Sequence, residues 1–196
     1  KSTPSRPDLN SLVLAAIAEA PRLVLDADGL NLLAEPDFLE TGRAALRART
    51  QSGLEPAILT PHPGEFRRLY PEMAATVEHD RIACAETLAA LTASVVVLKG
   101  AGTVIAFPPE QGTQEVWINT SGNAGMAKAG SGDVLSGLLG SLLAQRLPLR
   151  EAVCGAVYLH GFAADLQAEL LTERALTPED IISGLPDAFR QVGWDK

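Results

Sequence analysis

Residues 119–145 read N-T-S-G-N-A-G-M-A-K-A-G-S-G-D-V-L-S-G-L-L-G-S-L-L-A-Q, and the rest of the chain is organised around this stretch. Its first half is a loop of small residues that contains Gly122, Gly125, Gly130 and Gly132. Its second half carries apolar residues at helical spacing over 134–143. The pattern predicts a flexible loop that runs directly into the first turn of a buried helix.

Such a loop predicts an anion site. The first turn of a helix has unpaired N–H groups and a partial positive charge, and glycines let the backbone approach a ligand closely. The natural anion is phosphate. Asp133 lies at the opening of this site. A carboxylate there would act as the base that takes the proton from a hydroxyl as it attacks the phosphate. The alternative is an ordinary helix start, with Ser131 as the N-cap and Asp133 favoured only by the helix dipole.

Three short apolar runs predict the strands of a parallel α/β sheet, at 23–25, 57–59 and 95–98. A polar cluster follows each strand: D-A-D-G-L-N at 26–31, T-P-H-P-G-E at 60–65 and K-G-A-G-T at 99–103. Ligands bind at the carboxyl ends of parallel strands. We therefore expect these three clusters and the glycine-rich loop to converge on one edge of the sheet.

The remaining elements follow from periodicity and from turn residues. Residues 1–8 predict a loose lead-in, and a helix should end before Pro21. The other expected elements are helices at 36–50, 77–91 and 151–171, a β-ribbon at 103–107 and 115–118, a helix start at 177–180 and a last helix at 185–192.

The composition indicates one domain with a substantial core. The chain has 196 residues, 46% of them hydrophobic, and a net charge of −8. An acidic chain argues against nucleic acid and against an anionic membrane surface as partners. Cys84 and Cys154 predict reduced core thiols. There is no signal-like segment and no membrane-length apolar run, so we expect a cytoplasmic protein with no membrane association.

Four segments together resemble one known family. V-L-D-A-D-G-L-N-L-L, L-T-P-H-P-G-E-F, V-L-K-G-A-G-T-V-I and G-N-A-G-M-A-K-A-G-S-G-D-V-L-S-G are similar to segments of the ADP- or ATP-dependent NAD(P)H-hydrate dehydratases. The resemblance runs from about residue 9 to 185. It implies the ribokinase-like fold, a three-layer α/β/α arrangement with a mostly parallel central sheet and a small β-ribbon.

The resemblance implies a cofactor-repair activity. A hydroxyl on the hydrated nicotinamide ring is phosphorylated by ADP or ATP, phosphate then leaves, and NADH or NADPH is restored. Asp133 would be the base and would touch the hydrated cofactor. The N–H groups of Gly130, Ser131, Gly132 and Asp133 would hold the transferring phosphoryl group, where electrostatic stabilisation matters most.

The other implied site residues come from the three strand-end clusters and the loop. Nucleotide contacts are expected from Lys99, Gly100, Ala101, Gly102, Thr103 and Gly132. Substrate contacts are expected from His62, Asp28, Asn31 and Asn123. Glu65 would help hold Mg²⁺ through water, since Mg²⁺ usually keeps several waters.

Each of these roles has a simpler alternative. Lys99 could be a solvated charge, and His62 could only anchor its turn between two prolines. Glu65 could cap the helix that follows it. Asp28 and Asn31 could make ordinary turns, and Asn123 could shape the loop through bonds to the backbone.

The family normally carries a further N-terminal section of several strands. We therefore expect residues 1–196 to be a single ribokinase-like domain that lacks part of this section. An uncovered sheet edge and apolar surface would then predict either a partner segment or a homo-oligomer, with a tetramer preferred.

Two other functions remain open from the sequence. One is a kinase of the same fold that acts on a small vitamin-precursor alcohol, because Asp133 would do the same chemistry there. The other is a nucleotide-binding module without turnover.

Overall fold

The computed structural model describes residues 6–194, and the chain forms two compact units. The first unit contains the chain up to Gly100 together with Val104–Trp117. The second contains Ala101–Thr103 and the chain from Ile118 onward. The single domain expected over residues 1–196 stays a prediction.

A five-stranded mixed sheet has the strand order β1-β2-β3-β4-β5, and all of it except Ile118 belongs to the first unit. Its strands are β1 (Val24–Leu25), β2 (Ile58–Leu59), β3 (Val95–Leu98), β4 (Val104–Ala106) and β5 (Val116–Ile118). The pairs β1–β2 and β2–β3 are parallel, and β4 runs antiparallel to β3. The parallel strands and the ribbon are thus confirmed, and β3 has the predicted bounds.

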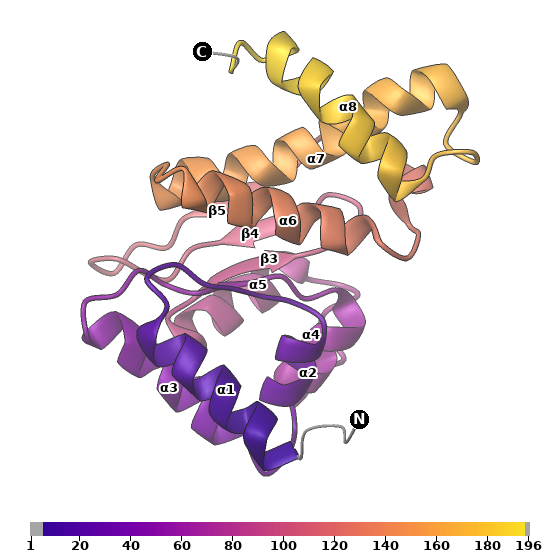
Figure 1. Ribbon diagram of the computed structural model, residues 1–196. Coiled ribbons are helices and arrows are strands. Elements are labelled where there is room, and N and C mark those ends of the chain that lie inside the picture. Colours follow the sequence, from indigo (N-terminus) through magenta and orange to yellow (C-terminus); the bar gives the residue numbers. More distant parts are fainter. Residues whose placement is uncertain (1–5, 195–196) are drawn as a thin grey trace. The chain divides into compact units, whose positions relative to one another are not determined.

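Five helices belong to the same unit: α1 (Arg6–Glu19), α2 (Asp28–Leu33), α3 (Leu39–Gln51), α4 (Pro63–Leu69) and α5 (Arg81–Thr92). A 3₁₀ turn, η1 (Pro71–Met73), follows α4. Helix α1 packs on α3, α3 on α5, and α5 on strands β3 and β4 (Figure 1). Phe66, Leu30 and Leu88 are at most 1% exposed in the core that these elements share. Burial of large apolar side chains is the main favourable term in folding.

Two expectations for this unit were wrong or incomplete. The lead-in predicted over residues 1–8 overlaps α1, which begins at Arg6, while residues 1–5 lie outside the described part. Helices α2 and α4 were not predicted as elements. Both are short and begin among turn-forming residues, so they lack the long apolar period that identifies a helix in a sequence.

A buried arginine joins the first and third helices of this unit. Arg49 is 2% exposed and donates to four main-chain carbonyl oxygens. Its acceptors are Ile17 O at 2.8 Å, Ala20 O at 2.7 Å, Pro21 O at 3.0 Å and Glu55 O at 2.6 Å. Burial lowers the pKa of this guanidinium, because desolvation disfavours the charged form. The carbonyls satisfy the donors and fix the end of α1 against the end of α3.

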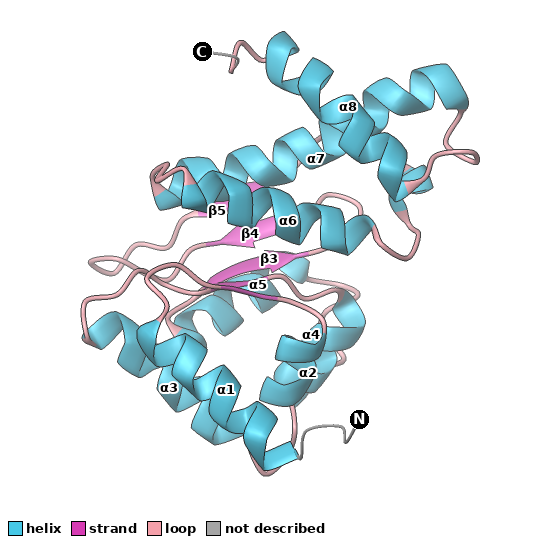
Figure 2. Cartoon of the chain, in the orientation of Figure 1, coloured by secondary structure: helices cyan, strands magenta, loops and turns pink. Residues whose placement is uncertain are grey.

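The second unit is helical (Figure 2). A 3₁₀ turn, η2 (Ala124–Met126), precedes three helices: α6 (Ser131–Ala144), α7 (Leu149–Leu171) and α8 (Pro178–Gln191). Helix α7 packs against both α6 and α8. The helix start at 177–180 and the last helix at 185–192 were predicted separately, but α8 is one helix that continues through Pro186. Within residues 6–194, no helix has the length and apolar character needed to cross a membrane.

Candidate active site

One residue from each of the three strand-end clusters meets the others in the first unit, as predicted, whereas the convergence of the glycine-rich loop with them stays a prediction. Nζ of Lys99, after β3, lies 2.7 Å from Oδ1 of Asp26, after β1, and 3.9 Å from Oε2 of Glu65. The Lys99 N–H donates to Pro61 O at 2.8 Å, which joins the segment after β2 to the segment after β3. One lysine is therefore shared by carboxylates from two neighbouring strand ends.

The ion pair changes the interpretation of this cluster. Lys99 was predicted as a phosphate contact, but its ammonium is already neutralised by Asp26, a residue absent from the predicted site. Ala27 follows Asp26 with φ 46° and ψ −115°, an unfavourable backbone conformation for alanine, and its N–H donates to Asp26 Oδ1 at 2.9 Å. Such strain clusters at functional sites. Asp26 therefore belongs among the candidate site residues.

His62 and Glu65 form a capping box at the start of α4. Nδ1 of His62 accepts from the N–H groups of Gly64 at 3.0 Å and Glu65 at 3.3 Å. Oε2 of Glu65 accepts from the His62 N–H at 2.8 Å. Because Nδ1 accepts, the neutral ring carries its proton on Nε2. The imidazole side chain is 52% exposed, and its Nε2 lies 3.6 Å from Glu65 Oε2.

The described residues do not offer a ready-made metal site. No group of three or more His, Cys, Asp or Glu side chains in residues 6–194 is arranged to hold an ion. Glu65, predicted to help hold Mg²⁺ through water, already accepts from a main-chain N–H through Oε2 and faces an ammonium. These contacts match the capping alternative, and the water-mediated role in holding Mg²⁺ stays a prediction.

Asp28 and Asn31 make no hydrogen bond or ion pair with Asp26, Glu65 or Lys99 in residues 6–194. Both are exposed on the short helix α2. Oδ1 of Asn31 accepts from the Arg68 guanidinium at 2.7 Å. Their predicted contact with substrate stays a prediction.

The N-terminus of α6 lacks a side-chain cap. The N-cap is Gly130, with φ 95°, a left-handed conformation that glycine adopts without strain. Ser131 was weighed as the cap, but it is the first helical residue instead. The Ser131 N–H donates to Lys128 O at 3.3 Å, whereas the N–H groups of Gly130, Gly132 and Asp133 have no partner among the described residues. Three of the four predicted phosphoryl-binding donors are thus unpaired.

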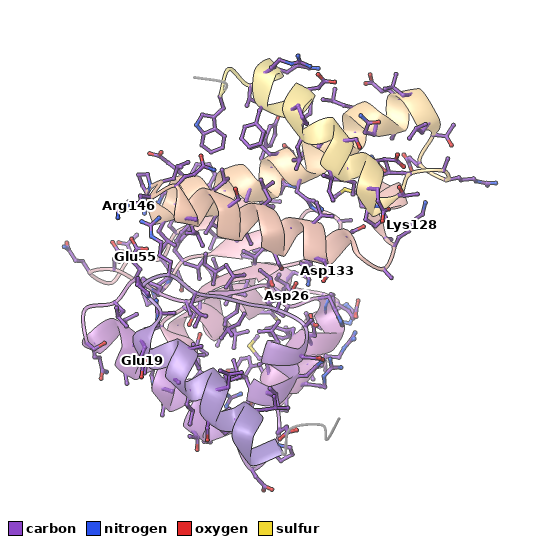
Figure 3. All side chains as sticks on the ribbon, viewed as in Figure 1. Glu19, Asp26, Glu55, Lys128, Asp133 and Arg146 are labelled. Carbon is purple, nitrogen blue, oxygen red and sulfur yellow. The ribbon has the colours of Figure 1, made fainter. Side chains whose placement is uncertain are left out.

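Two side chains at the same helix start also lack partners. The Ser131 hydroxyl has no hydrogen-bond partner although the residue is only 7% exposed. Asp133 is exposed on the first turn of α6 (Figure 3), and its carboxylate makes no hydrogen bond or ion pair with residues 6–194. A carboxylate beside a row of free N–H donors is the arrangement expected for a base next to a phosphoryl-binding site.

The loop before α6 is tied to other parts of the second unit. Asn123 accepts from the Gly125 N–H at 3.0 Å through Oδ1 and donates to Asp165 Oδ1 at 2.8 Å through Nδ2. Nζ of Lys128 donates to the carbonyls of Arg174 and Leu176. The geometry of Asn123 matches the loop-shaping alternative. Asp165, on α7, was missed because a contact 42 residues away leaves no local signal in the sequence.

The segment predicted to bind nucleotide is divided between the units. Lys99 and Gly100 end the first unit, where the Arg81 guanidinium donates to Leu98 O at 2.7 Å beside them. Ala101, Gly102 and Thr103 belong to the second, where Thr103 O accepts from the Asn119 N–H at 2.9 Å.

The cysteines and two histidines lie outside these groups. Cys84 is buried as predicted, Cys154 is half-buried, and neither forms a disulfide within residues 6–194. His160 is buried in α7 and His79 is exposed.

Known proteins resemble this chain over most of its length. The family model described as NAD(P)H-hydrate dehydratase matches residues 4–187. An ADP-dependent (S)-NAD(P)H-hydrate dehydratase from Neisseria meningitidis serogroup B is 46% identical over 75% of this chain and 46% of its own length. The chain spans less than half the length of the first curated relatives it matches.

Solved structures are also similar to this chain. An ADP/ATP-dependent NAD(P)H-hydrate dehydratase from Bacillus subtilis, co-crystallised with ATP/Mg²⁺ and soaked with CoA, has a TM-score of 0.64 and 38% identity over 69% of this chain and 49% of its own. A ribokinase-like superfamily protein from Enterococcus faecalis has a TM-score of 0.62 and 28% identity over 94% of this chain and 68% of its own. The predicted ribokinase-like α/β class is confirmed.

Proposed function

The chain belongs to the NAD(P)H-hydrate dehydratase family, and from this premise we propose that it restores hydrated NADH or NADPH at the expense of ADP or ATP. The observation that carries the proposal is the open N-terminus of α6, where unpaired N–H groups stand beside the unpaired carboxylate of Asp133. A helix start of this kind binds phosphate, and the carboxylate is suited to take a proton.

The proposed reaction has two steps. Asp133 takes the proton of the ring hydroxyl as the hydroxyl oxygen attacks the terminal phosphorus of the nucleotide. The P–O bond to the leaving nucleotide breaks, and ADP becomes AMP, or ATP becomes ADP. The C–O bond between the ring and the phosphate group then breaks, the neighbouring ring carbon loses a proton, and the double bond that forms restores the reduced nicotinamide. The N–H groups of Gly132 and Asp133 stabilise the charge on the transferring phosphoryl oxygens.

The other site residues bind and orient the ligands in this proposal. His62 donates from Nε2 to the hydrated cofactor. The backbone that follows β3, from Lys99 to Thr103, contacts the nucleotide. Lys99 acts together with Asp26, so it contributes a hydrogen bond more than a net positive charge. Mg²⁺, when present, would arrive with the nucleotide phosphates, which supply its preferred oxygen ligands.

The test is recovery of reduced-nicotinamide absorbance. The full chain is incubated with hydrated NADH or hydrated NADPH and with ADP or ATP, and AMP or ADP formation is followed in parallel. Recovery that requires nucleotide supports the proposal, and Asp133→Asn is the matched control because it removes the base and keeps the side-chain shape. Failure to recover absorbance with either nucleotide contradicts the proposal.

Two other outcomes would identify the competing functions. Phosphorylation of a small vitamin-precursor alcohol, without repair of hydrated cofactor, would indicate a kinase of the same fold. An ADP-dependent rise in melting temperature without any turnover would indicate a nucleotide-binding module. A homo-oligomer, with a tetramer preferred, stays a prediction.

A further inference from the structure

We propose that Asp165, on α7, is a positioning residue that holds the loop entering α6, and this inference rests on the proposed function. Its two carboxylate oxygens accept from two different groups of that loop. Oδ2 accepts from the Gly122 N–H at 2.7 Å, and Oδ1 accepts from Asn123 Nδ2 at 2.8 Å. Hydrogen bonds to an ionised carboxylate are about twice as strong as neutral ones.

The loop lies directly on one face of α7. The Ser121 hydroxyl donates to Tyr158 O at 2.8 Å, and Asp165 follows on the same helix two turns later. Gly161 lies between them, and a Cβ there would come within 2.3 Å of Ser121 Oγ. Position 161 therefore has to lack a side chain for the loop to reach this face.

The loop remains attached up to the start of α6. Gly125 sits against the carbonyl of Glu173, where a Cβ would come within 2.4 Å of the oxygen. Lys128 then donates to the carbonyls of Arg174 and Leu176. Gly130, the N-cap of α6, follows two residues later. Asp165 thus fixes the first part of a chain segment whose end carries the proposed phosphoryl-binding N–H groups and Asp133.

Asp165 does not need to touch a ligand to matter. Small displacements of catalytic groups can cost about a hundredfold in rate. An error in the loop path would displace the first turn of α6. The expected effect of losing Asp165 is therefore on turnover more than on the Michaelis constants.

The hydrogen-bond pattern allows a sharp test by exchanging two residues. In Asp165→Asn, one oxygen is replaced by an NH₂ group that faces another donor, so one of the two bonds is lost. In Asn123→Asp, two carboxylates face each other. In the double variant N123D/D165N, the amide at position 165 accepts from the Gly122 N–H and donates to the carboxylate at 123, which also accepts from the Gly125 N–H. All three bonds and the net charge are restored.

We expect each single variant to lose about tenfold or more in kcat and the double variant to recover most of it. Ile181→Val is the stability control: Ile181 is fully buried in α8, has no bond to the loop, and its shortening destabilises the unit without changing kcat. All rates are measured at a temperature where each variant is fully folded.

Two results would overturn the inference. One is an active wild type with unchanged kcat in Asp165→Asn. The other is a loss of kcat in Ile181→Val as large as in Asp165→Asn, which would assign the loss to stability alone. If the wild type itself is inactive, the proposed function fails, and ADP affinity becomes the readout. Weaker ADP binding in Asp165→Asn that the double variant restores supports the positioning role, and equal affinity overturns it.

Discussion

The N-termini of α4 and α6 were both predicted to contribute to a ligand site, and they differ in how their polar groups are used. At α4, His62 and Glu65 cap the helix reciprocally, with Pro63 at the first position, and Glu65 also faces Lys99. At α6 no side chain caps the helix, the Ser131 hydroxyl is buried without a partner, and the Asp133 carboxylate is unpaired in the described chain. At the N-terminus of α4 the capping side chains have partners within the protein. At the N-terminus of α6, N–H donors and a carboxylate have no partner among the described residues.

This difference distinguishes a helix N-terminus that stabilises the protein, at α4, from one that is suited to catalysis, at α6. Unpaired buried polar groups cost about 1–3 kcal/mol each, so a sequence selected for stability alone would cap α6 as it caps α4. Functional sites commonly give up stability in this way. Substitutions at α4 should therefore act on stability, and substitutions at α6 should act on rate.

The largest expected effect is that of Asp133→Asn. Removing the base should lower kcat by about 10²–10⁴-fold, while loss of its interaction with the helix dipole should cost about 0.3–1 kcal/mol. Steady-state kinetics and denaturant unfolding measure the two effects. A variant that keeps wild-type turnover would show that the α6 N-terminus is not the chemical centre.

The next largest effect is expected at His62. His62→Ala removes the N-cap of α4 and should cost about 1 kcal/mol of unfolding free energy. His62→Asn restores a good N-cap but lacks the exposed Nε2–H donor, so it should keep stability within a few tenths of a kcal/mol of wild type. If His62 also binds substrate, the KM for hydrated cofactor should rise in both variants. An unchanged KM in His62→Asn would leave His62 with the capping role alone.

Ser131→Ala should have a smaller effect, with stability and function moving in opposite directions. Removal of a buried hydroxyl without a partner should raise the unfolding free energy, by at most about 1 kcal/mol. If the hydroxyl hydrogen-bonds the phosphoryl group, the rate should fall. Thermal unfolding without nucleotide, together with kcat, tests this prediction. A loss of stability would mean that the hydroxyl is already satisfied in the free protein.

The smallest effect concerns the start of α8, which resembles α4 in having a capping box. The Thr177 hydroxyl and N–H donate to Asp180 Oδ2 at 2.7 and 2.8 Å and hold the pKa of Asp180 below its ordinary value. A depressed folded-state pKa contributes stability that is present above the unfolded pKa and is lost as pH falls through the folded one. The melting temperatures of wild type and Asp180→Asn should differ at neutral pH and converge in acid. A difference independent of pH would exclude the charge as its cause.

Local pattern was enough to predict part of this structure. Strand β3 was predicted at its observed bounds because four consecutive apolar residues are enclosed by Ser94 and Lys99. Convergence of the strand ends followed from the geometry of a parallel sheet. The position of α6 was also predicted from local pattern, because a glycine-rich loop is followed directly by an apolar run at helical spacing.

The features that were not predicted depend either on contacts between residues far apart in the sequence or on residues in positions that their type rarely occupies. Helix α4 was hidden because Pro63 and Gly64 indicate a turn, while His62 is not among the preferred N-caps. Helix α8 was divided at Pro186, which lacks the N–H that a helix interior normally uses. The pairings of Asp26 with Lys99 and of Asp165 with Asn123 join residues 73 and 42 positions apart. Only the folded chain brings such partners together.

The buried guanidinium of Arg49 has a consequence for behaviour in acid. Its acceptors are all peptide carbonyls, which do not take up protons at the pH where carboxylates become neutral. The junction between the ends of α1 and α3 should therefore outlast ion pairs such as that of Lys99 with Asp26 when the medium is acidified. Acid unfolding of the first unit would therefore begin at the sheet edge that carries Lys99 and Asp26. The contact between the ends of α1 and α3 would be lost last.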